Sequence, residues 1–194
     1  MNKAVRINPF PGLRPYREDE DYLFFGRDNE ISAFLQLMEQ QRFIVLAGQA
    51  GSGKTSFLRA GVFSALAKGY LSRIGLSWHT IIVQPDDQPY ANLAKGLTEV
   101  LGTNGKHDEQ FIEAGLRSGY DGLTERLAAY GFKGESPVLI VIDQFEELLL
   151  YNRQTSSDDD IGPVVSSFLE MLAYAASNKD YNIYIITTLR TSFL

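Results

Sequence analysis

A glycine-rich turn followed by lysine and threonine could bind a polyphosphate. It matches the pattern G-x-x-x-x-G-K-[ST], the P-loop, and directly follows the apolar run 43–47. Its glycines let successive backbone N–H groups point into one anion-sized space, and the helix that follows adds its positive end there. We expect the Lys54 ammonium to reach the β- and γ-phosphates and the Thr55 hydroxyl to bind Mg²⁺. The expected binding residues are Gly48, Gln49, Ala50, Gly51, Ser52, Gly53, Lys54, Thr55 and Ser56.

An aspartate at the end of the most apolar run, 138–142, could complete the magnesium site. A carboxylate at the tip of a buried strand can hold Mg²⁺, usually through water, and Asp143 has this position. By itself Asp143 could simply begin a loop, and the acidic Glu146 and Glu147 could simply begin a helix. The glycine-rich turn upstream favours the magnesium interpretation.

Two absences favour ATP over GTP. Asn178, Lys179 and Asp180 superficially resemble the guanine-reading N-K-x-D sequence, but Tyr181 stands where the aspartate is needed. The third residue after Asp143 is a glutamate, whereas small GTPases have a glycine there.

An arginine after the last apolar run is a further candidate. Ligands of parallel sheets bind at the carboxyl edge of the strands, so Arg190 could contact the γ-phosphate. A solvated arginine at the end of a strand is the alternative, and the residues alone leave both open.

The elements that position these residues alternate between helices and short apolar strands. Apolar residues recur at helical spacing over 29–41, 55–70, 92–101, 109–116, 123–130, 146–151 and 164–176. Short apolar runs typical of buried strands cover 43–47, 80–83, 138–142 and 184–188. This alternation predicts an α/β fold with a parallel sheet covered on both faces.

Composition excludes several classes of protein. A chain of 194 residues fits one domain, and its net charge of −6 argues against nucleic acid or an anionic membrane as the main partner. It has no cysteine, which excludes disulfides and thiolate metal sites. No run approaches the ~20 apolar residues of a membrane span, and no apolar segment follows the first residues as in a secretory signal. We therefore expect a cytoplasmic protein.

Three other strings, taken with the glycine-rich turn, resemble the STAND class of P-loop NTPases, in particular the novel STAND NTPase 1 group. They are NPFPGLRPY at 8–16, FFGR at 24–27 and DQFEEL at 143–148, and the similarity covers nearly the whole chain. The opening string and DQFEEL are far more specific than a P-loop alone.

The resemblance implies a three-layer fold of the ASCE type with strand order 5-1-4-3-2. The fifth strand and the lid are missing from this sequence, so we expect an N-terminal fragment of the NTPase domain. Residues 1–29 would be an N-terminal segment whose Phe25, Gly26 and Arg27 lie against adenine, and 30–194 the core, truncated after its fourth strand. An uncovered strand at 43–47 would be an aggregation hazard, so we expect the N-terminal segment or another copy to cover it.

The resemblance also implies roles for two charged residues. Arg190 would be the sensor that follows the fourth strand. Many relatives have a catalytic acid directly after the magnesium-binding aspartate, but here that position is Gln144. Glu146 is then the candidate for orienting the attacking water, with Glu147 second, and hydrolysis is expected to be slow.

Members of this class are regulated ATP switches in signalling, programmed death and antiphage defence. They exchange ADP for ATP and self-associate, with sensor and effector regions that would lie outside this chain. A slow ATPase switch and a non-hydrolysing, nucleotide-dependent scaffold both remain open. A P-loop kinase would need lid arginines and an acceptor pocket, and neither is visible in the sequence.

Overall fold

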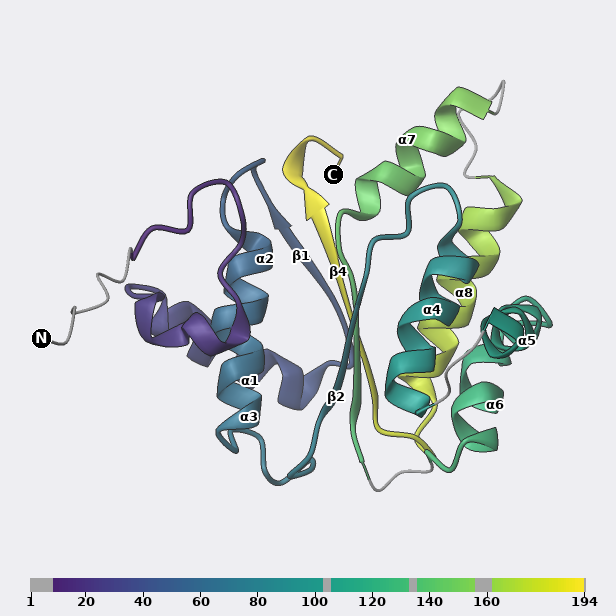
Figure 1. Cartoon of the computed structure of the whole chain (residues 1–194), viewed down its shortest axis with the longest axis horizontal. Coiled ribbons are helices and arrows are strands. Elements are labelled where there is room, and N and C mark those ends of the chain that lie inside the picture. Colours follow the sequence, from purple (N-terminus) through teal and green to yellow (C-terminus); the bar gives the residue numbers. More distant parts are fainter. Residues whose placement is uncertain (1–8, 103–105, 133–135, 156–161, 194) are drawn as a thin grey trace, which may run out of the picture.

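A four-stranded parallel sheet forms the centre of the molecule (Figure 1). The computed structural model describes residues 9–102, 106–132, 136–155 and 162–193. The strands are β1 (Phe43–Gly48), β2 (His79–Val83), β3 (Val138–Ile142) and β4 (Ile183–Arg190), in the order β1-β4-β3-β2. The predicted α/β fold is confirmed, and this order agrees with the 1-4-3-2 part of the expected arrangement.

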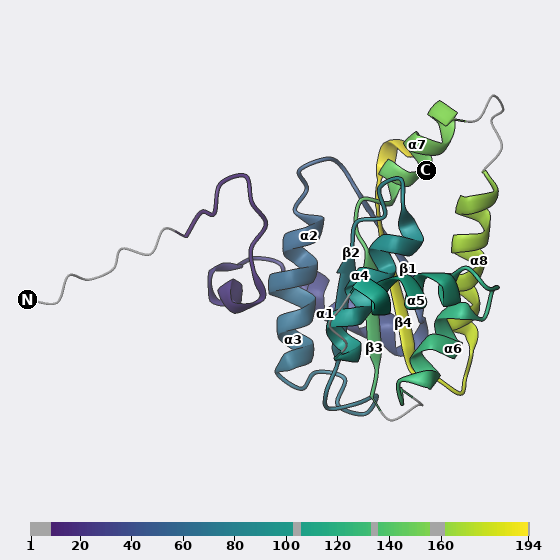
Figure 2. The ribbon, with the colours of Figure 1, turned by 45° about the vertical axis from the view of Figure 1, so that its right-hand side comes forward.

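Helices cover both faces of the sheet, which gives three layers (Figures 1 and 2). One face carries α1 (Asp28–Gln40) and the helical segment made of α2 (Lys54–Ser56), η2 (Phe57–Phe63) and α3 (Ser64–Ala67). The other carries α4 (Pro89–Leu101), α5 (Lys106–Leu116), α6 (Gly122–Ala129), α7 (Phe145–Thr155) and α8 (Pro163–Ser177). No helix in these residue ranges is long and apolar enough to cross a membrane.

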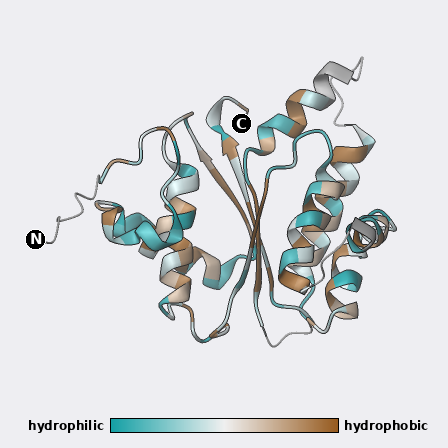
Figure 3. Cartoon of the chain, in the orientation of Figure 1, coloured by the Kyte–Doolittle hydropathy of each residue, from teal (hydrophilic) through white to brown (hydrophobic). Residues whose placement is uncertain are grey.

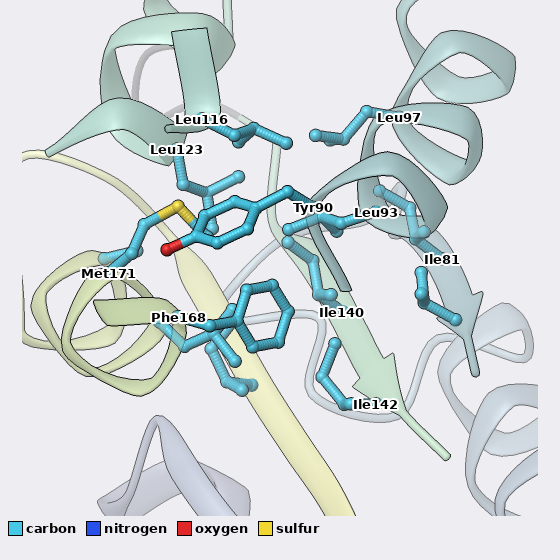
Figure 4. Close-up of a cluster of buried hydrophobic side chains, with 14 of the residues drawn as sticks. Ile81, Tyr90, Leu93, Leu97, Leu116, Leu123, Ile140, Ile142, Phe168 and Met171 are labelled. Carbon is cyan, nitrogen blue, oxygen red and sulfur yellow. The ribbon is translucent and has the colours of Figure 1, made fainter. Parts of the chain in front are cut away.

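Two apolar cores, one on each face, hold the layers together. Successive side chains of a strand point to opposite faces, so β3 contributes Ile140 to one core and Leu139 to the other. All five residues of β3 are buried, which explains its continuous apolar sequence. Figure 4 shows the core under α4 and α8, where the rings of Tyr90 and Phe168 contact each other. The brown strands of Figure 3 show the same apolar centre.

The helical segment after the glycine-rich turn differs from its prediction. Its middle part, η2, is π-helical, and it ends at Ala67, whereas the sequence pattern predicts a helix to Tyr70. Gly69 follows in the left-handed region with φ +88°, which no continuing helix can adopt. Residues 68–70 therefore belong to a turn.

The described N-terminal residues pack on a helix and not on the sheet edge. The short helix η1 (Glu18–Leu23) lies against η2 and α3, where the Ser64 hydroxyl donates to Asp21 at 2.7 Å and Lys68 pairs with the same carboxylate. Among the strands placed in the structure β1 pairs only with β4, and its Val45 is 49% exposed. For residues 9 onward, the expectation that the N-terminal segment covers this edge is wrong. Coverage by another copy stays a prediction.

Candidate functional site

The glycine-rich turn connects β1 to α2 and needs its glycines for two different reasons. Gly51 and Gly53 lie in the left-handed region, with φ +72° and +81°, where a side chain causes strain. A Cβ on Gly48 would come within 2.8 Å of the Ser52 hydroxyl oxygen. The turn can therefore curl tightly at the end of β1 only with this glycine spacing.

Lys54 folds back over the turn from the first residue of α2. Its ammonium donates to the carbonyl oxygens of Gly48 at 2.9 Å and Gln49 at 3.2 Å. The positive charge therefore lies at the carboxyl end of β1, next to the backbone of the turn.

A hydrogen-bonded cluster joins the turn to the ends of β3 and β4. The Thr55 hydroxyl donates to one carboxylate oxygen of Asp143 at 2.8 Å, and the Thr188 hydroxyl donates to the other at 2.6 Å. The backbone N–H of Gln144 donates to the Thr188 hydroxyl at 2.9 Å. Asp143 and Thr188 are 3% and 0% exposed, so the cluster is fixed within the protein. The two expected magnesium ligands, Thr55 and Asp143, therefore lie within hydrogen-bonding distance.

Sequence reasoning missed Thr188. A signal was present, since Thr187 and Thr188 are hydroxyl residues at the carboxyl end of an otherwise apolar strand. Ligand-binding groups of parallel sheets lie at that edge. The expected strand order already places the fourth strand beside the third, but only the structure shows that the Thr188 hydroxyl donates to Asp143.

The candidate water-orienting acid and the candidate sensor form an ion pair. The Arg190 Nε lies 2.8 Å from one oxygen of Glu146, and the Arg190 backbone N–H donates to the other at 3.3 Å. A second guanidinium nitrogen lies 3.5 Å from Glu147. Glu146 is 1% exposed although its partner's side chain is 43% exposed. Arg190 is thus the solvent-facing partner of a buried carboxylate and not a free cation.

A cleft of about 450 Å³ lies at these strand ends, and part of the N-terminal segment borders it. Gly12, Leu13, Arg14 and Pro15 border it alongside the glycine-rich turn, Asp143, Glu146 and Arg190. The Tyr16 backbone N–H donates to the Ser56 hydroxyl at 3.2 Å, which ties the segment to α2.

Arg14 is held in this cleft by a carboxylate that sequence reasoning also missed. Two of its guanidinium nitrogens donate to the two oxygens of Glu20, each at 2.6 Å. The Arg14 hydrogen bonds, together with the backbone N–H of Arg17, lower the pKa of Glu20 from 4.5 to about 2. Nothing in the local spacing marks these residues as a pair.

The loop expected to contact adenine is only partly near a cavity. Arg27 donates to the Ser52 carbonyl at 3.2 Å and lines a second cavity of about 480 Å³. Phe25 in contrast is 77% exposed, and Gly26 forms a left-handed turn with φ +82°. Most of this cavity is apolar, and it adjoins the cleft because both are bordered by Ser52 and Lys54; its apolar lining residues are Ala33, Phe34, Leu37, Leu46, Ala47 and Phe57.

The donor set fits magnesium better than a protein-only metal cage. Thr55 and Asp143 offer hard oxygen ligands from one hydroxyl and one carboxylate, the kind of partial shell that Mg²⁺ completes with phosphates and water. In the part of the chain that the structure describes, no group of three or more histidine, cysteine or acidic residues is placed to hold a metal.

Solved structures share this fold at low sequence identity. The ORC2 protein of Aeropyrum pernix, in ADPNP–ADP complexes, matches with 14% identity and a TM-score of 0.53 over 94% of this chain and 43% of its own. The Walker-type ATPase paby2304 of Pyrococcus abyssi matches with 17% identity and a TM-score of 0.50, over 91% of this chain and 48% of its own. A chain of the HORMA:CdnC:Trip13 complex of E. coli MS115-1 matches with 15% identity and 0.50, over 93% and 61%.

These likenesses establish the fold alone, and this chain spans less than two thirds of each matched chain. The curated proteins contain no significant match. A family model described as Novel STAND NTPase 1 matches residues 9–194, which is nearly the whole chain. The family and the P-loop fold support a nucleotide-binding module. The chain belongs to the Novel STAND NTPase 1 family.

Proposed function

We propose that this chain binds ATP with Mg²⁺, hydrolyses it slowly, and is the switch module of a larger signalling protein. The observation that carries the proposal is the 2.8 Å hydrogen bond between Thr55 and Asp143. It brings a hydroxyl from the glycine-rich turn and a carboxylate from a different strand to one point, as an Mg²⁺ ion bound to a nucleotide requires.

The phosphates would lie in the glycine-rich turn. Its backbone N–H groups and the start of the helical segment that follows supply positive potential, and Lys54 adds a full charge. Lys54 would exchange the carbonyls of Gly48 and Gln49 for phosphate oxygens. Thr55 and Asp143 would hold Mg²⁺, which when bound would neutralise charge on the phosphate oxygens.

The buried acid Glu146 would orient the attacking water. It is the carboxylate nearest to Arg190, whose exposed guanidinium would face the γ-phosphate side of the cleft. As long as both oxygens of Glu146 accept from Arg190, neither is fully available to a water molecule. This competition is the physical reason to expect slow hydrolysis.

The base would occupy the apolar cavity that adjoins the cleft at Ser52 and Lys54. An aromatic ring gains from burial against Phe34 and Leu37, and Arg27 borders the same cavity. Adenine is favoured over guanine because the chain lacks the N-K-x-D sequence. Exchange of ADP for ATP would then promote self-association.

A second candidate is a scaffold that binds nucleotide without hydrolysing it. It is favoured by Gln144, an amide at the position where many relatives have an acid, and by the engagement of Glu146 with Arg190. In that case the binding of nucleotide, without hydrolysis, would order the N-terminal segment.

Isothermal titration with ATP, ADP and GTP, with and without Mg²⁺, tests the binding proposal. Lys54→Ala removes the ammonium and should weaken ATP binding by about 100-fold, the effect of losing charge-assisted hydrogen bonds to two phosphates. Lys179→Ala, at an exposed lysine outside the cleft, is the matched control. Equal ATP affinity of the Lys54→Ala and unaltered proteins would show that the proposed site is wrong.

Glu146→Ala separates the two candidates. A hydrolysing switch should lose its phosphate release and retain ATP after gel filtration, because the attacking water is no longer oriented. A scaffold should be unchanged in both measurements. Glu170→Ala, an exposed glutamate on α8, controls for the loss of one negative charge.

A further inference from the structure

Part of the N-terminal segment borders the phosphate cleft. Residues 12–15 lie along the same cleft as the glycine-rich turn and the ends of β3 and β4. In Figures 1 and 2 the segment lies on the side of α2 and α3 that faces away from the sheet, and its loop reaches the level at which α2 begins. The segment thus adds a second wall to the cleft, which we call the N-terminal wall (residues 12–15).

This wall is bonded to the helix that carries Lys54 and Thr55. The Tyr16 backbone N–H donates to the hydroxyl of Ser56, the residue next to Thr55. Further along, Asp21 accepts from Ser64 and pairs with Lys68, so the segment is attached to both ends of this helical region. Its position relative to the phosphate site is therefore defined by contacts and not by the chain connection alone.

Arg14 is the cation of the N-terminal wall, and its geometry leaves donors for a ligand. A guanidinium has five N–H groups. Within the described residues three of them are used, two by Glu20 and one by the Pro15 carbonyl at 3.1 Å. Arg14 is 49% exposed in its side chain while Glu20 is only 10% exposed. The carboxylate is buried as a support, and the arginine faces the cleft.

We propose that Arg14 is a nucleotide-binding residue, held in place by Glu20, which donates to the bound polyphosphate and closes the N-terminal wall over it. This inference rests on the proposed function, since it assumes that the glycine-rich turn holds the phosphates. A planar guanidinium already fixed by a carboxylate loses little freedom when it binds a phosphate, which favours arginine in this role.

A purely structural role for the pair predicts a different pattern. Arg17 also donates to Glu20, through its backbone N–H at 2.9 Å and its guanidinium at 3.3 Å, yet Arg17 does not border the cleft. Arg17→Ala keeps the backbone bond to Glu20 and removes the 3.3 Å side-chain bond. If Arg14 only anchored the turn at Glu20, Arg14→Ala and Glu20→Gln should affect the protein alike, because both break the same ion pair. If Arg14 binds phosphate, Arg14→Ala should weaken nucleotide binding more than Glu20→Gln or Arg17→Ala does.

Titration calorimetry with ATP and ADP tests this. We expect Arg14→Ala to weaken ATP binding about tenfold, as for the loss of a hydrogen bond to a charged group. Arg14→Lys should retain part of the affinity because a lysine keeps the charge but not the fork. Arg17→Ala should bind as the unaltered protein does. Glu20→Gln should weaken binding less than Arg14→Ala, because the guanidinium stays but is held less firmly.

The slowing of trypsin cleavage by ATP is a readout that a structural role of Arg14 alone would not change. Trypsin cleaves after Arg17 at a rate that follows local opening of the segment. Saturating ATP should slow this cleavage in the unaltered protein. When the variants are also saturated with ATP, Arg14→Ala should lose this slowing. Arg14→Lys should show less of it than the unaltered protein.

Failure of this inference and failure of the proposed function are distinguishable. If the unaltered protein does not bind ATP, the proposed function fails. If the unaltered protein binds ATP and Lys54→Ala does not, but Arg14→Ala and Arg14→Lys bind as tightly and keep the ATP protection, only the role of Arg14 is wrong. Equal weakening by Arg14→Ala and Glu20→Gln would likewise assign Arg14 an anchoring role and overturn the proposal.

Discussion

The two walls of the proposed phosphate cleft are held by different forces. The strand-end wall, made of the glycine-rich turn, Asp143 and Glu146, lies at the carboxyl ends of the strands, and its acidic residues are 3% and 1% exposed. The N-terminal wall is attached by ion pairs and a few hydrogen bonds, and its Arg14 is half exposed. One wall derives its geometry from the apolar cores, whereas the Arg14 of the other is held by an ion pair at the surface.

This difference separates what is constant in the site from what responds to conditions. Groups fixed by a packed core keep their positions until the domain unfolds. Exposed ion pairs are weak singly, and salt or a change of protonation weakens them further. We therefore expect damage to the strand-end wall to have large effects on stability and binding, and damage to the N-terminal wall to have smaller effects on both.

Of three changes that test this difference, Thr188→Val is expected to have the largest effect. This near-isosteric change leaves the Gln144 N–H and one oxygen of Asp143 without their partner in a buried site. We expect a loss of about 2 kcal/mol in the free energy of unfolding, together with weaker Mg²⁺-dependent ATP binding. Urea denaturation and calorimetry measure the two effects. Thr187→Val, at the buried neighbour on the opposite face of β4, is the control and should leave Mg²⁺-dependent binding unchanged.

A smaller, pH-dependent effect is expected for Glu20→Gln. The pKa of Glu20 is about 2 in the folded protein and 4.5 ordinarily, so the unfolded chain takes up the proton first as the pH falls. The stability that Glu20 contributes is therefore complete above pH 4.5 and is lost as the pH falls towards 2. Melting temperatures of the unaltered and Glu20→Gln proteins should differ at neutral pH and converge in acid. The same comparison with Glu18→Gln, at an exposed glutamate, should show no such convergence.

The smallest effect is expected for Ser56→Ala. It removes the acceptor of the Tyr16 N–H, a 3.2 Å hydrogen bond worth about 1 kcal/mol or less. Global stability should hardly change, but amide hydrogen exchange at Tyr16 should become faster. Ser32→Ala, at an exposed serine of α1, should leave that exchange rate as it is. Unchanged exchange in Ser56→Ala would mean that this bond does not attach the N-terminal wall.

The strand-end wall could largely be predicted from the sequence, and the N-terminal wall could not. The glycine-rich turn with its lysine and threonine is a local pattern, and it also decides the meaning of the aspartate at the end of the third apolar run. The partners Thr188 of Asp143 and Arg190 of Glu146 come from separate elements, and the expected strand order does not show which side chains meet. The Arg14–Glu20 pair depends on how an irregular segment turns back on itself, and no periodicity records that.

The strand order also has a consequence for how the site comes into being during synthesis. β4, the last of the four strands to leave the ribosome, inserts between β1 and β3. Until Ile183–Arg190 has emerged, the strand that ends in the glycine-rich turn and the strand that ends in Asp143 have no common neighbour. The nascent chain thus cannot bring the glycine-rich turn and Asp143 together before β4 has emerged. We therefore expect nucleotide binding to wait for this long-range pairing.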